Sequence, residues 1–237
     1  MKSKDRGADS GVLAPTAGRT FRRTVVAGEG WIDHHTHNLI HVRCKMTDST
    51  RERMLTATAR LLQERGYRGT SLKHILEESE APRGSMYHHF PGGKKELVRE
   101  ATRIEVQYIT DYLKAAFEES PGPAEAIRTY IRGAREHARG SGYRLGCPVA
   151  SLILDSPEAS SAIGELCRGA LEEWRALIRD GLVTGGIPAA RADSLATLIL
   201  TSVEGALILA RSRRDPEPLD AISRELVAAV EGLAALE

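Results

Sequence analysis

The sequence predicts an all-α protein of about nine helices, because its composition and its hydrophobic spacing both favour helices over strands. Aromatic residues make up only 5% of the 237 residues, which is few for a sandwich or a barrel. Ala, Leu, Arg and Glu, which favour helices, are plentiful. No alternating strand pattern and no internal repeat competes with this fold class.

The first 45 residues predict a disordered N-terminal extension. They are rich in Gly, Ser, Thr and Arg and show neither a helical nor a strand period. A capping box follows directly, in which Ser49 and Glu52 satisfy free amides at a helix start. We therefore expect the folded protein to begin at Met46 and residues 1–45 to be dispensable for folding and for function.

The first two helices of the folded part are predicted from a short apolar stripe and its terminators. Apolar residues recur at helical spacing over Met54–Leu62, and Gly66 supplies the left-handed residue that ends this helix. Thr70 and Ser71 can both cap a second, short helix. That helix is expected to end near Ser79.

A third short helix completes a helix-turn-helix unit at residues 46–93. Pro82 occupies its first turn, and the Pro-Gly-Gly of residues 91–93 stops it after Phe90. Two short helices separated by about three residues form a helix-turn-helix geometry. Met86 and Phe90 lie four residues apart, so they share one face, which we expect to be buried.

The middle of the chain predicts one long helix and two shorter segments. A helix over 94–119 would span about 38 Å at 1.5 Å per residue, and residues 121–123 end it with two prolines. A further helix is expected over 124–138, before a glycine-rich break at 140–142. A short apolar segment follows at 147–154.

The last three helices are placed by their first-turn prolines and by glycine. Ser156 as cap and Pro157 in the first turn predict a helix that continues to Gly185. Pro188 opens the next helix. A final helix is expected over residues 219–236. Residues 94–237 thus form a second, larger helical domain.

Charge is uneven along the chain, although the net charge is only +1. Basic residues outnumber acidic ones by 8 to 4 in residues 1–45 and by 10 to 8 in residues 46–100. Acidic residues outnumber basic ones by 20 to 15 in residues 101–237. A basic front and an acidic back suggest different partners. So small an excess does not identify a nucleic-acid binder by itself.

Cysteine content and hydropathy indicate a cytoplasmic protein without a membrane partner. The three cysteines are too few and too scattered for a disulfide framework or a zinc site, and they fit a reducing compartment; they are Cys44, Cys147 and Cys167. No apolar run reaches the roughly 20 residues of a membrane span. The longest candidate, Leu195–Ala210, carries Glu204 in its middle.

Several motifs resemble one family. The run Arg83-Gly84-Ser85-Met86-Tyr87-His88-His89-Phe90, with the Gly-Gly-Lys that follows, resembles the DNA-binding module of TetR-family regulators. Gly146-Cys147-Pro148-Val149-Ala150, Glu204-Gly205-Ala206 and Arg213-Arg214-Asp215-Pro216 are similar to the LmrA/YxaF branch. The resemblance implies a repressor that binds a palindromic double-stranded DNA operator as a homodimer and is released by a small-molecule effector. It implies no catalysis, no metal and no cofactor.

The third short helix carries the expected DNA contacts, since its outward face would enter the major groove. Arg83 can reach a guanine edge or a phosphate, and the other polar groups can bind phosphate oxygens. For Thr70, Lys73 and Lys94 the contact is implied by the family resemblance. A solvated helix face is the alternative for each residue. The expected DNA-binding residues are Thr70, Ser71, Lys73, Arg83, Gly84, Ser85, Tyr87, His88, His89 and Lys94.

The resemblance also implies a ligand cavity between the long helices and a dimer built from the last two. The pocket candidates are Tyr108, Tyr112, Phe117, Tyr143, Cys147, Leu152, Trp174, Ile178 and Glu204, with ordinary core packing as the alternative. The dimer candidates are Ser202, Gly205, Ala206, Leu209, Leu226 and Leu233, with the intramolecular core as the alternative. Glu204, a carboxylate among apolar residues, needs water, a cation or a hydrogen-bond partner.

Two other functions compete with a DNA-binding regulator. A helical protein-interaction module could use the same exposed face for a partner protein. A metal-dependent enzyme is suggested by the histidines at 34, 35, 37 and 41, but these have no acidic ligand at helical spacing. Cys147 has no adjacent base, which argues against a nucleophile. We therefore expect no enzyme activity.

Overall fold

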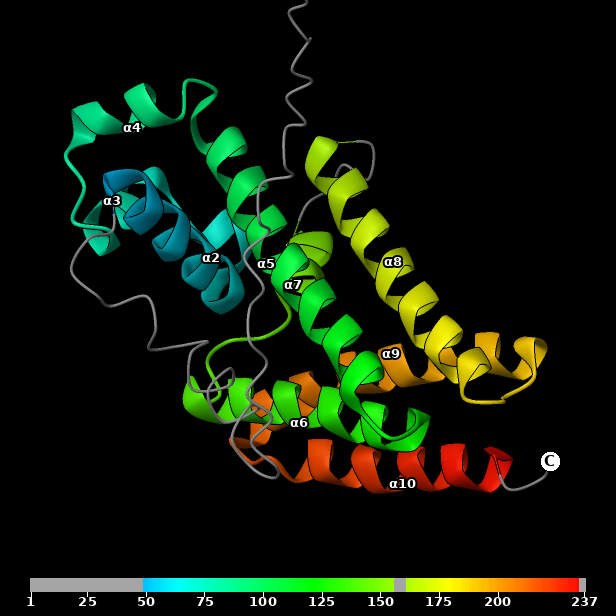
Figure 1. The fold of residues 1–237 in the computed structure, drawn as a ribbon. Helices are drawn as coiled ribbons and strands as arrows, with labels where there is room; N and C mark the ends of the chain where they lie inside the picture. The colour runs from blue at the N-terminus through cyan, green and yellow to red at the C-terminus, as the bar shows by residue number, and fades with distance from the viewer. Residues whose placement is uncertain (1–48, 156–160, 235–237) are drawn as a thin grey trace, which may run out of the picture.

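The computed structural model describes residues 49–155 and 161–234, and the predicted extension over residues 1–45 and Met46 lie outside this part. The described residues form nine α-helices and no strand, which confirms the all-α fold class (Figure 1). The helices are α2 (Thr50–Gly69), α3 (Leu72–Glu78), α4 (Arg83–His89), α5 (Gly93–Glu119), α6 (Pro123–Gly140), α7 (Pro148–Asp155), α8 (Ala162–Thr184), α9 (Ala189–Arg213) and α10 (Glu217–Ala234).

Helix α2 begins with the predicted capping box. The Glu52 amide donates to the Ser49 hydroxyl at 3.3 Å, and the Ser49 amide donates to the Glu52 carboxylate at 2.9 Å. At the other end Gly66 has a φ of 70°, which breaks the regular helix before one more turn. The left-handed residue predicted at Gly66 is confirmed.

The cap of α3 differs from the prediction at one residue. The Ser71 hydroxyl accepts from the His74 amide at 3.2 Å and caps the helix as expected. Thr70 does not cap it, because its hydroxyl donates to the Gly66 carbonyl at 2.8 Å. The expectation that Thr70 also caps α3 is therefore wrong, since this side chain closes the end of α2.

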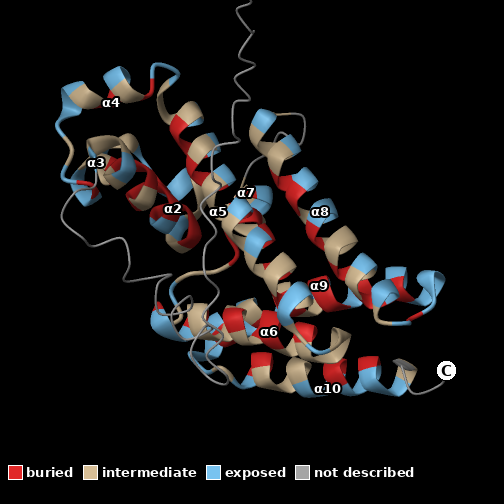
Figure 2. Cartoon of the chain, viewed as in Figure 1, coloured by how far each residue is buried: buried red, intermediate tan, exposed pale blue. Residues whose placement is uncertain are grey.

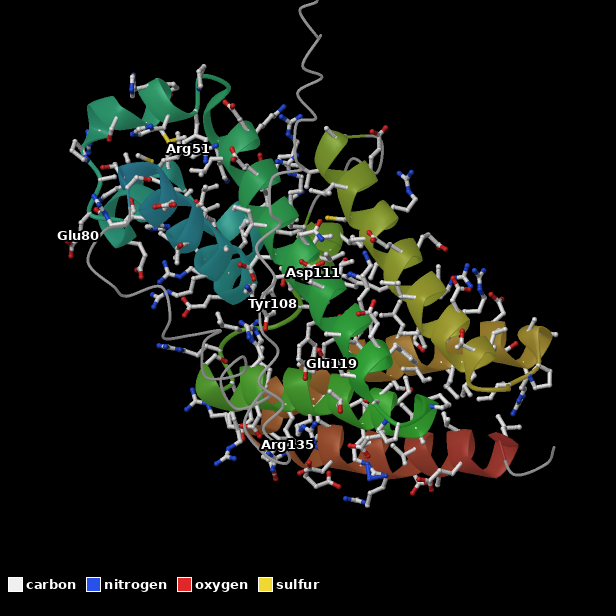
Figure 3. The ribbon with its side chains drawn as sticks, in the orientation of Figure 1. Arg51, Glu80, Tyr108, Asp111, Glu119 and Arg135 are labelled. Carbon is white, nitrogen blue, oxygen red and sulfur yellow. The ribbon has the colours of Figure 1, made fainter. Side chains whose placement is uncertain are left out.

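A first hydrophobic cluster joins α2, α3 and α4 to the beginning of α5. Met86 and Phe90 are buried in it, as predicted. The guanidinium of Arg51, which is labelled in Figure 3, lies 5.2 Å from the centre of the buried Phe90 ring. Burial of a side chain such as Phe90 contributes about 1.5–3 kcal/mol. With one face of α4 anchored in this way, its opposite face is turned outward. The cluster consists of Met54, Leu55, Ala59, Leu61, Ile75, Met86, Phe90, Leu97 and Ala101.

A second, larger cluster fills the space between α5, α6, α8, α9 and α10. Trp174 of α8 is buried in it, and its indole N–H donates to the Thr110 hydroxyl of α5 at 2.9 Å. Glycine permits close approach at one crossing, because a Cβ at Gly133 of α6 would lie 2.5 Å from the Tyr112 ring of α5. The buried residues lie on the faces that the helices turn toward one another (Figure 2).

Helix α8 begins later than predicted. The Ser161 hydroxyl accepts from the Gly164 amide at 3.1 Å, and the helix starts at Ala162. The predicted start at Ser156 and Pro157 is wrong in position, and both residues lie outside the described part of the chain. Either serine has the chemistry of an N-cap, so the sequence did not distinguish them.

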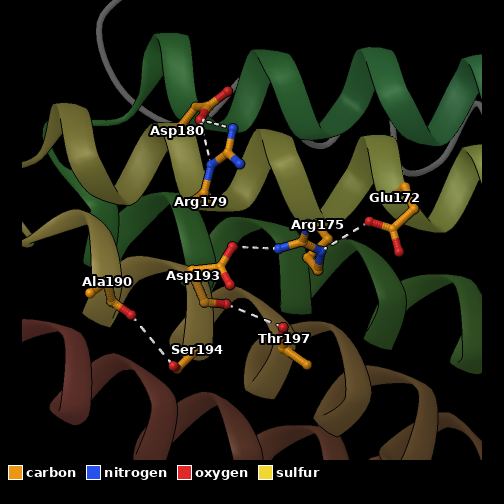
Figure 4. A network of polar contacts seen from close by, with 8 residues as sticks. All are labelled: Glu172, Arg175, Arg179, Asp180, Ala190, Asp193, Ser194 and Thr197. Atoms are coloured by element: carbon orange, nitrogen blue, oxygen red, sulfur yellow. Dashed lines mark hydrogen bonds and ion pairs between the residues drawn. The ribbon is translucent and has the colours of Figure 1, made fainter.

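Ion pairs on the surface connect α8 to the first turns of α9. The Arg175 guanidinium of α8 lies 3.2 Å from the Glu172 carboxylate and 2.5 Å from the Asp193 carboxylate of α9 (Figure 4). Hydrogen bonds to both carboxylates raise the pKa of Arg175, with Asp193 contributing most. Such ion pairs near the surface contribute little to stability.

Helix α9 has an unusually apolar outer face. Leu198, Ile208 and Leu209 are 51%, 62% and 48% exposed. By length and composition alone, α9 is the one helix in the described ranges that could cross a membrane. Its other face is packed in the protein core, where Ile199, Val203 and Ala206 are buried. A helix with a buried inner face and an exposed apolar outer face is typical of an interface between subunits.

Candidate nucleic-acid interface and buried cavity

Helix α4 presents a polar and aromatic surface at the outer end of the unit formed by α2, α3 and α4. This surface lies away from α6, α9 and α10 (Figure 1). Arg83, Gly84 and His88 are exposed, and Tyr87 is 63% exposed. No heavy atom would lie within 4 Å of a Cβ on Gly84, so this side of the helix is open. An exposed helix with an arginine and a tyrosine on one face suits the major groove of DNA.

Two of the predicted α4 residues are less accessible. The Ser85 hydroxyl donates to the Pro82 carbonyl at 2.6 Å, which stabilises the first turn of α4. Pro82 was predicted in the first turn of this helix, but it is the N-cap, and α4 begins at Arg83. His89 is half-buried, and its ring packs edge-on against His88 with centroids 5.0 Å apart.

The remaining predicted DNA contacts differ in exposure. Ser71 and Lys73 are exposed on α3, where the Lys73 ammonium lies 3.8 Å from the Glu77 carboxylate. Thr70 is fully buried, so it cannot reach a phosphate in this arrangement. The Lys94 ammonium donates to the Tyr67 carbonyl at 2.8 Å and lies 4.0 Å from the centre of that ring. Burial lowers the pKa of Lys94, and the nearby carboxylate of Asp155 opposes this effect.

The kink at Gly66 leaves backbone groups of α2 free to bond side chains of α7 and α9. A helix that stops leaves its last carbonyls without intrahelical donors. Arg211 of α9 supplies the donors, at 3.1 Å to the Gln63 carbonyl and 2.7 Å to the Glu64 carbonyl. Asp155 of α7 accepts from the Arg68 amide at 2.5 Å. The C-terminal end of α2 is thus held by α7 and α9.

A cavity of about 90 Å³ lies among α2, α5, α6, α8 and α9. Five of the predicted pocket residues line it, namely Tyr108, Tyr112, Cys147, Trp174 and Glu204. The other four do not. Leu152 and Ile178 are buried in the core, Tyr143 packs against its edge, and Phe117 packs against Gly181.

Three polar residues missed by the sequence reading meet on the cavity wall. The His137 Nε2 atom of α6 and the Gln63 Oε1 atom of α2 lie 2.9 Å apart in a hydrogen bond. The Gln63 amide nitrogen donates to the Glu105 carboxylate of α5 at 3.4 Å. Burial lowers the pKa of His137. Glu105 and His137 are 42 and 74 positions from Gln63 in the sequence, so no local pattern identifies the three residues as neighbours.

Glu204 of α9 lies on the same wall in mostly apolar surroundings. Burial raises its pKa, while a hydrogen bond from the Cys147 thiol acts in the opposite direction. Burial also raises the pKa of Cys147 and of Tyr130, and the carboxylate of Glu204 adds to both effects. The hydroxyl of Tyr108, which is labelled in Figure 3, is buried and has no hydrogen-bond partner among the described residues. Burial, with Tyr112 and Glu105 nearby, raises the pKa of Tyr108 to about 12.

The predicted dimer residues divide between the core and the surface. Ala206 and Leu226 are buried within the single chain, and Leu233 packs against the same core. Gly205 and Leu209 are exposed on α9, and Ser202 is half-buried. These three residues border a groove of about 350 Å³ between α9 and α10. The exposed Leu198 and Ile208, which extend this apolar face, were not predicted.

The described residues contain no group of three His, Cys, Asp or Glu side chains placed to hold a metal ion. The four tail histidines suggested for that role lie outside the described part of the chain.

Two family models match the chain. Residues 54–101 match "Bacterial regulatory proteins, tetR family", and residues 123–225 match "Transcriptional regulator LmrA/YxaF-like, C-terminal domain". An uncharacterized HTH-type transcriptional regulator of Mycobacterium tuberculosis is 36% identical over 74% of this chain and 91% of its own length. The regulator LmrA of Bacillus subtilis is 33% identical over 73% of this chain and 93% of its own length.

Among solved structures, a cysteine-substituted TetR-family regulator, CifR, has the same fold with a TM-score of 0.68. It is 23% identical, and the match covers 79% of this chain and 98% of that one. That protein was solved with a 26-base-pair double-stranded operator.

Proposed function

Because the chain belongs to the TetR family of bacterial transcriptional regulators, it is a DNA-binding regulator and not an enzyme, and we propose that it represses transcription from a palindromic operator. The observation that carries this proposal is the exposed polar face of α4, with Arg83 and Tyr87 outward and Met86 and Phe90 anchored in the first cluster. A soluble regulator of this kind acts in the cytoplasm, where it meets the chromosome.

The proposed DNA-binding domain covers residues 46–93, and residues 94–237 form the ligand-binding and dimerisation domain. Leu97 and Ala101 of α5 pack in the first hydrophobic cluster, whereas Leu113 of the same helix packs in the second, larger cluster. Helix α5 is therefore the element through which a movement in one domain would reach the other.

The proposed repressor is a homodimer formed through α9 and α10. The exposed apolar side chains of Leu198, Ile208 and Leu209 on α9 support this assignment, because a contiguous exposed apolar patch is uncommon in a monomer. The groove beside Gly205 gives a partner helix room to pack closely. A two-fold dimer would carry two copies of α4 at a spacing of whole DNA turns, which a palindromic operator matches.

The proposed effector site is the cavity of about 90 Å³ among α2, α5, α6, α8 and α9. A ligand there would meet the hydrogen bond between Gln63 and His137, and Gln63 belongs to a helix of the DNA-binding unit. Release from DNA requires that the ligand bind the non-binding conformation more tightly than the binding one. Movement of α5 and α2 would then change the distance between the two copies of α4.

Selection of bound sequences from random duplex DNA tests the proposal. We expect enrichment of one palindrome with half-sites separated by about one helical turn or a multiple of it. Sedimentation of the purified complex should give two chains per duplex. Enrichment of no sequence, or of a single unpaired half-site by a monomer, would contradict the repressor model.

A further inference from the structure

The cavity has an acidic lining, although it is largely apolar. Among the residues that the structure describes, its lining side chains include two carboxyl groups, Glu105 and Glu204, and neither a lysine nor an arginine. The imidazole among these described side chains, His137, is held in the hydrogen bond to Gln63. A negatively charged ligand would therefore find no lysine or arginine among the described lining residues with which to form an ion pair. The charges of the wall favour a ligand that carries a positive charge.

Glu204 lacks a strong partner among the described residues. The hydrogen bond that reaches its carboxyl group comes from the Cys147 thiol, which is a weak donor. Glu204 itself is half-buried. A carboxylate in largely apolar surroundings without a cation or several donors is costly, and proteins normally pair it. An ammonium group in the cavity would supply both the opposite charge and up to three donors. Glu204 is thus placed to act as a counter-ion.

The other walls suit an aromatic ligand. Tyr108, Tyr112, Tyr130 and Trp174 line the cavity. Aromatic rings attract cations through their faces and pack well against other rings. The buried Tyr108 hydroxyl has no hydrogen-bond partner in the described structure, so a ligand atom could satisfy it.

The size of the cavity links binding to movement. Its volume of about 90 Å³ is smaller than the ~150 Å³ of a cavity known to admit benzene. A ligand with even one ring must therefore displace a wall. One of those walls is Gln63 of α2, so occupancy would strain the tie between α2 and α6.

We propose that this cavity binds a small alkyl amine that carries one aromatic ring, in its ammonium form, with the Glu204 carboxylate as counter-ion. The inference rests on the proposed effector site and assigns its ligand class. No covalent bond forms, and any proton on the Glu204 carboxyl passes to the amine or to water. The affinity for the amine should exceed that for a neutral analogue of the same shape.

Three probes with one ring and similar length test the charge preference. They are 2-phenylethylamine, 2-phenylethanol and 3-phenylpropanoate, titrated calorimetrically into the full-length protein without DNA. A hydrogen bond to a charged group is worth about 1.5–3 kcal/mol, so the amine should bind at least about tenfold more tightly than the alcohol. The propanoate should bind most weakly. Equal or tighter binding of the alcohol or the propanoate, or binding of none of the probes, would overturn the proposal.

Variants of nearly equal shape assign the preference to one residue. Glu204→Gln should reduce the preference for the amine over the alcohol to within about twofold, while affinity for the alcohol stays close to the wild-type value. Glu231→Gln, which changes an exposed carboxylate on α10, is the matched control and should preserve the preference. A Glu204→Gln protein that folds and keeps the full preference would refute the role of Glu204. If this variant does not fold, the order of the three probes on the wild-type protein decides.

These titrations need no operator. Failure of the charge preference would leave the DNA selection experiment unaffected, and failure of DNA binding would leave the titrations unaffected. The two proposals can therefore fail separately.

Discussion

Gln63 and His137 share a hydrogen bond of 2.9 Å, although one lies on α2 and the other on α6. Helix α2 belongs to the cluster that supports α4, and α6 belongs to the large helical core. The cavity therefore has one wall in each proposed domain. A ligand bound at the proposed effector site would therefore contact α2 of the helix-turn-helix unit directly.

The double variant Arg83→Ala/Tyr87→Ala should lose operator binding. Each contact of this kind is worth about 1–3 kcal/mol, so the affinity should fall at least about 30-fold in a gel-shift titration. Both side chains are exposed, so the helical circular dichroism should stay unchanged. Arg191→Ala, an exposed arginine on α9, is the control and should bind normally. Wild-type affinity in the double variant would reject α4 as the reading helix.

Arg211→Ala should weaken the hold of α9 on α2. The variant removes two hydrogen bonds to helix-end carbonyls, which water can partly replace. We expect a loss of about 1 kcal/mol in the free energy of unfolding by urea and a several-fold lower operator affinity. Arg191→Ala removes an exposed arginine from the same helix, outside the groove between α9 and α10, and serves as control. Equal effects of the two variants would show that the contact to α2 is unimportant.

Gly133→Ala should destabilise the protein and disturb the cavity. The added Cβ would lie 2.5 Å from the Tyr112 ring, which must move or shift α5 away from α6. Overpacking of this kind typically costs about 1–3 kcal/mol. Gly169→Ala on α8, where no atom lies within 4 Å of the added Cβ, should instead be neutral or stabilise by up to ~1 kcal/mol. Thermal or urea unfolding of the pair gives the comparison, and similar stabilities would contradict the packing seen at Gly133.

Stability should decrease as the pH falls below the ordinary pKa of histidine, in part through His137. Burial lowers the pKa of His137 in the folded state, so the unfolded chain binds the proton first. The loss begins near the unfolded value of about 6.5 and is complete below the lowered folded value. Gln63, Glu105 and Glu204 face the same cavity from α2, α5 and α9.

His137→Gln should therefore flatten the dependence of the unfolding free energy on pH between about 8 and 5. Urea titrations of both proteins at several pH values measure the difference. His88→Gln, on the exposed face of α4, is the control and should follow the wild-type profile. Parallel profiles for wild type and His137→Gln would contradict the assignment.

Ile208→Glu should convert the proposed dimer into a monomer. Ile208 is 62% exposed in the single chain, so a charge there is tolerated by the subunit but not by an apolar interface. Sedimentation equilibrium should show a loss of dimer by at least about 100-fold in dissociation constant. Val183→Glu changes an apolar side chain of α8 that is also exposed, and it should remain dimeric. Persistence of the dimer in Ile208→Glu would place the interface elsewhere.

Local chemistry made much of the fold predictable from the sequence. The capping box at Ser49, the left-handed Gly66 and the buried pair Met86 and Phe90 depend on residues within a few positions of one another. Two of the errors at helix ends occurred where two nearby residues had equal local chemistry. Thr70 competed with Ser71 as the cap of α3, and packing at the end of α2 decided between them.

The sequence by itself determined the helices, the helix-turn-helix unit and the family, because caps, breakers and hydrophobic periods act over a few residues. Only the tertiary structure decided which of the polar residues share a cavity. Gln63, Glu105 and His137 come from three helices. Glu204 of α9 forms a hydrogen bond with Cys147, which directly precedes α7. The angles at which the helices pack set these meetings, and those angles depend on the whole core at once.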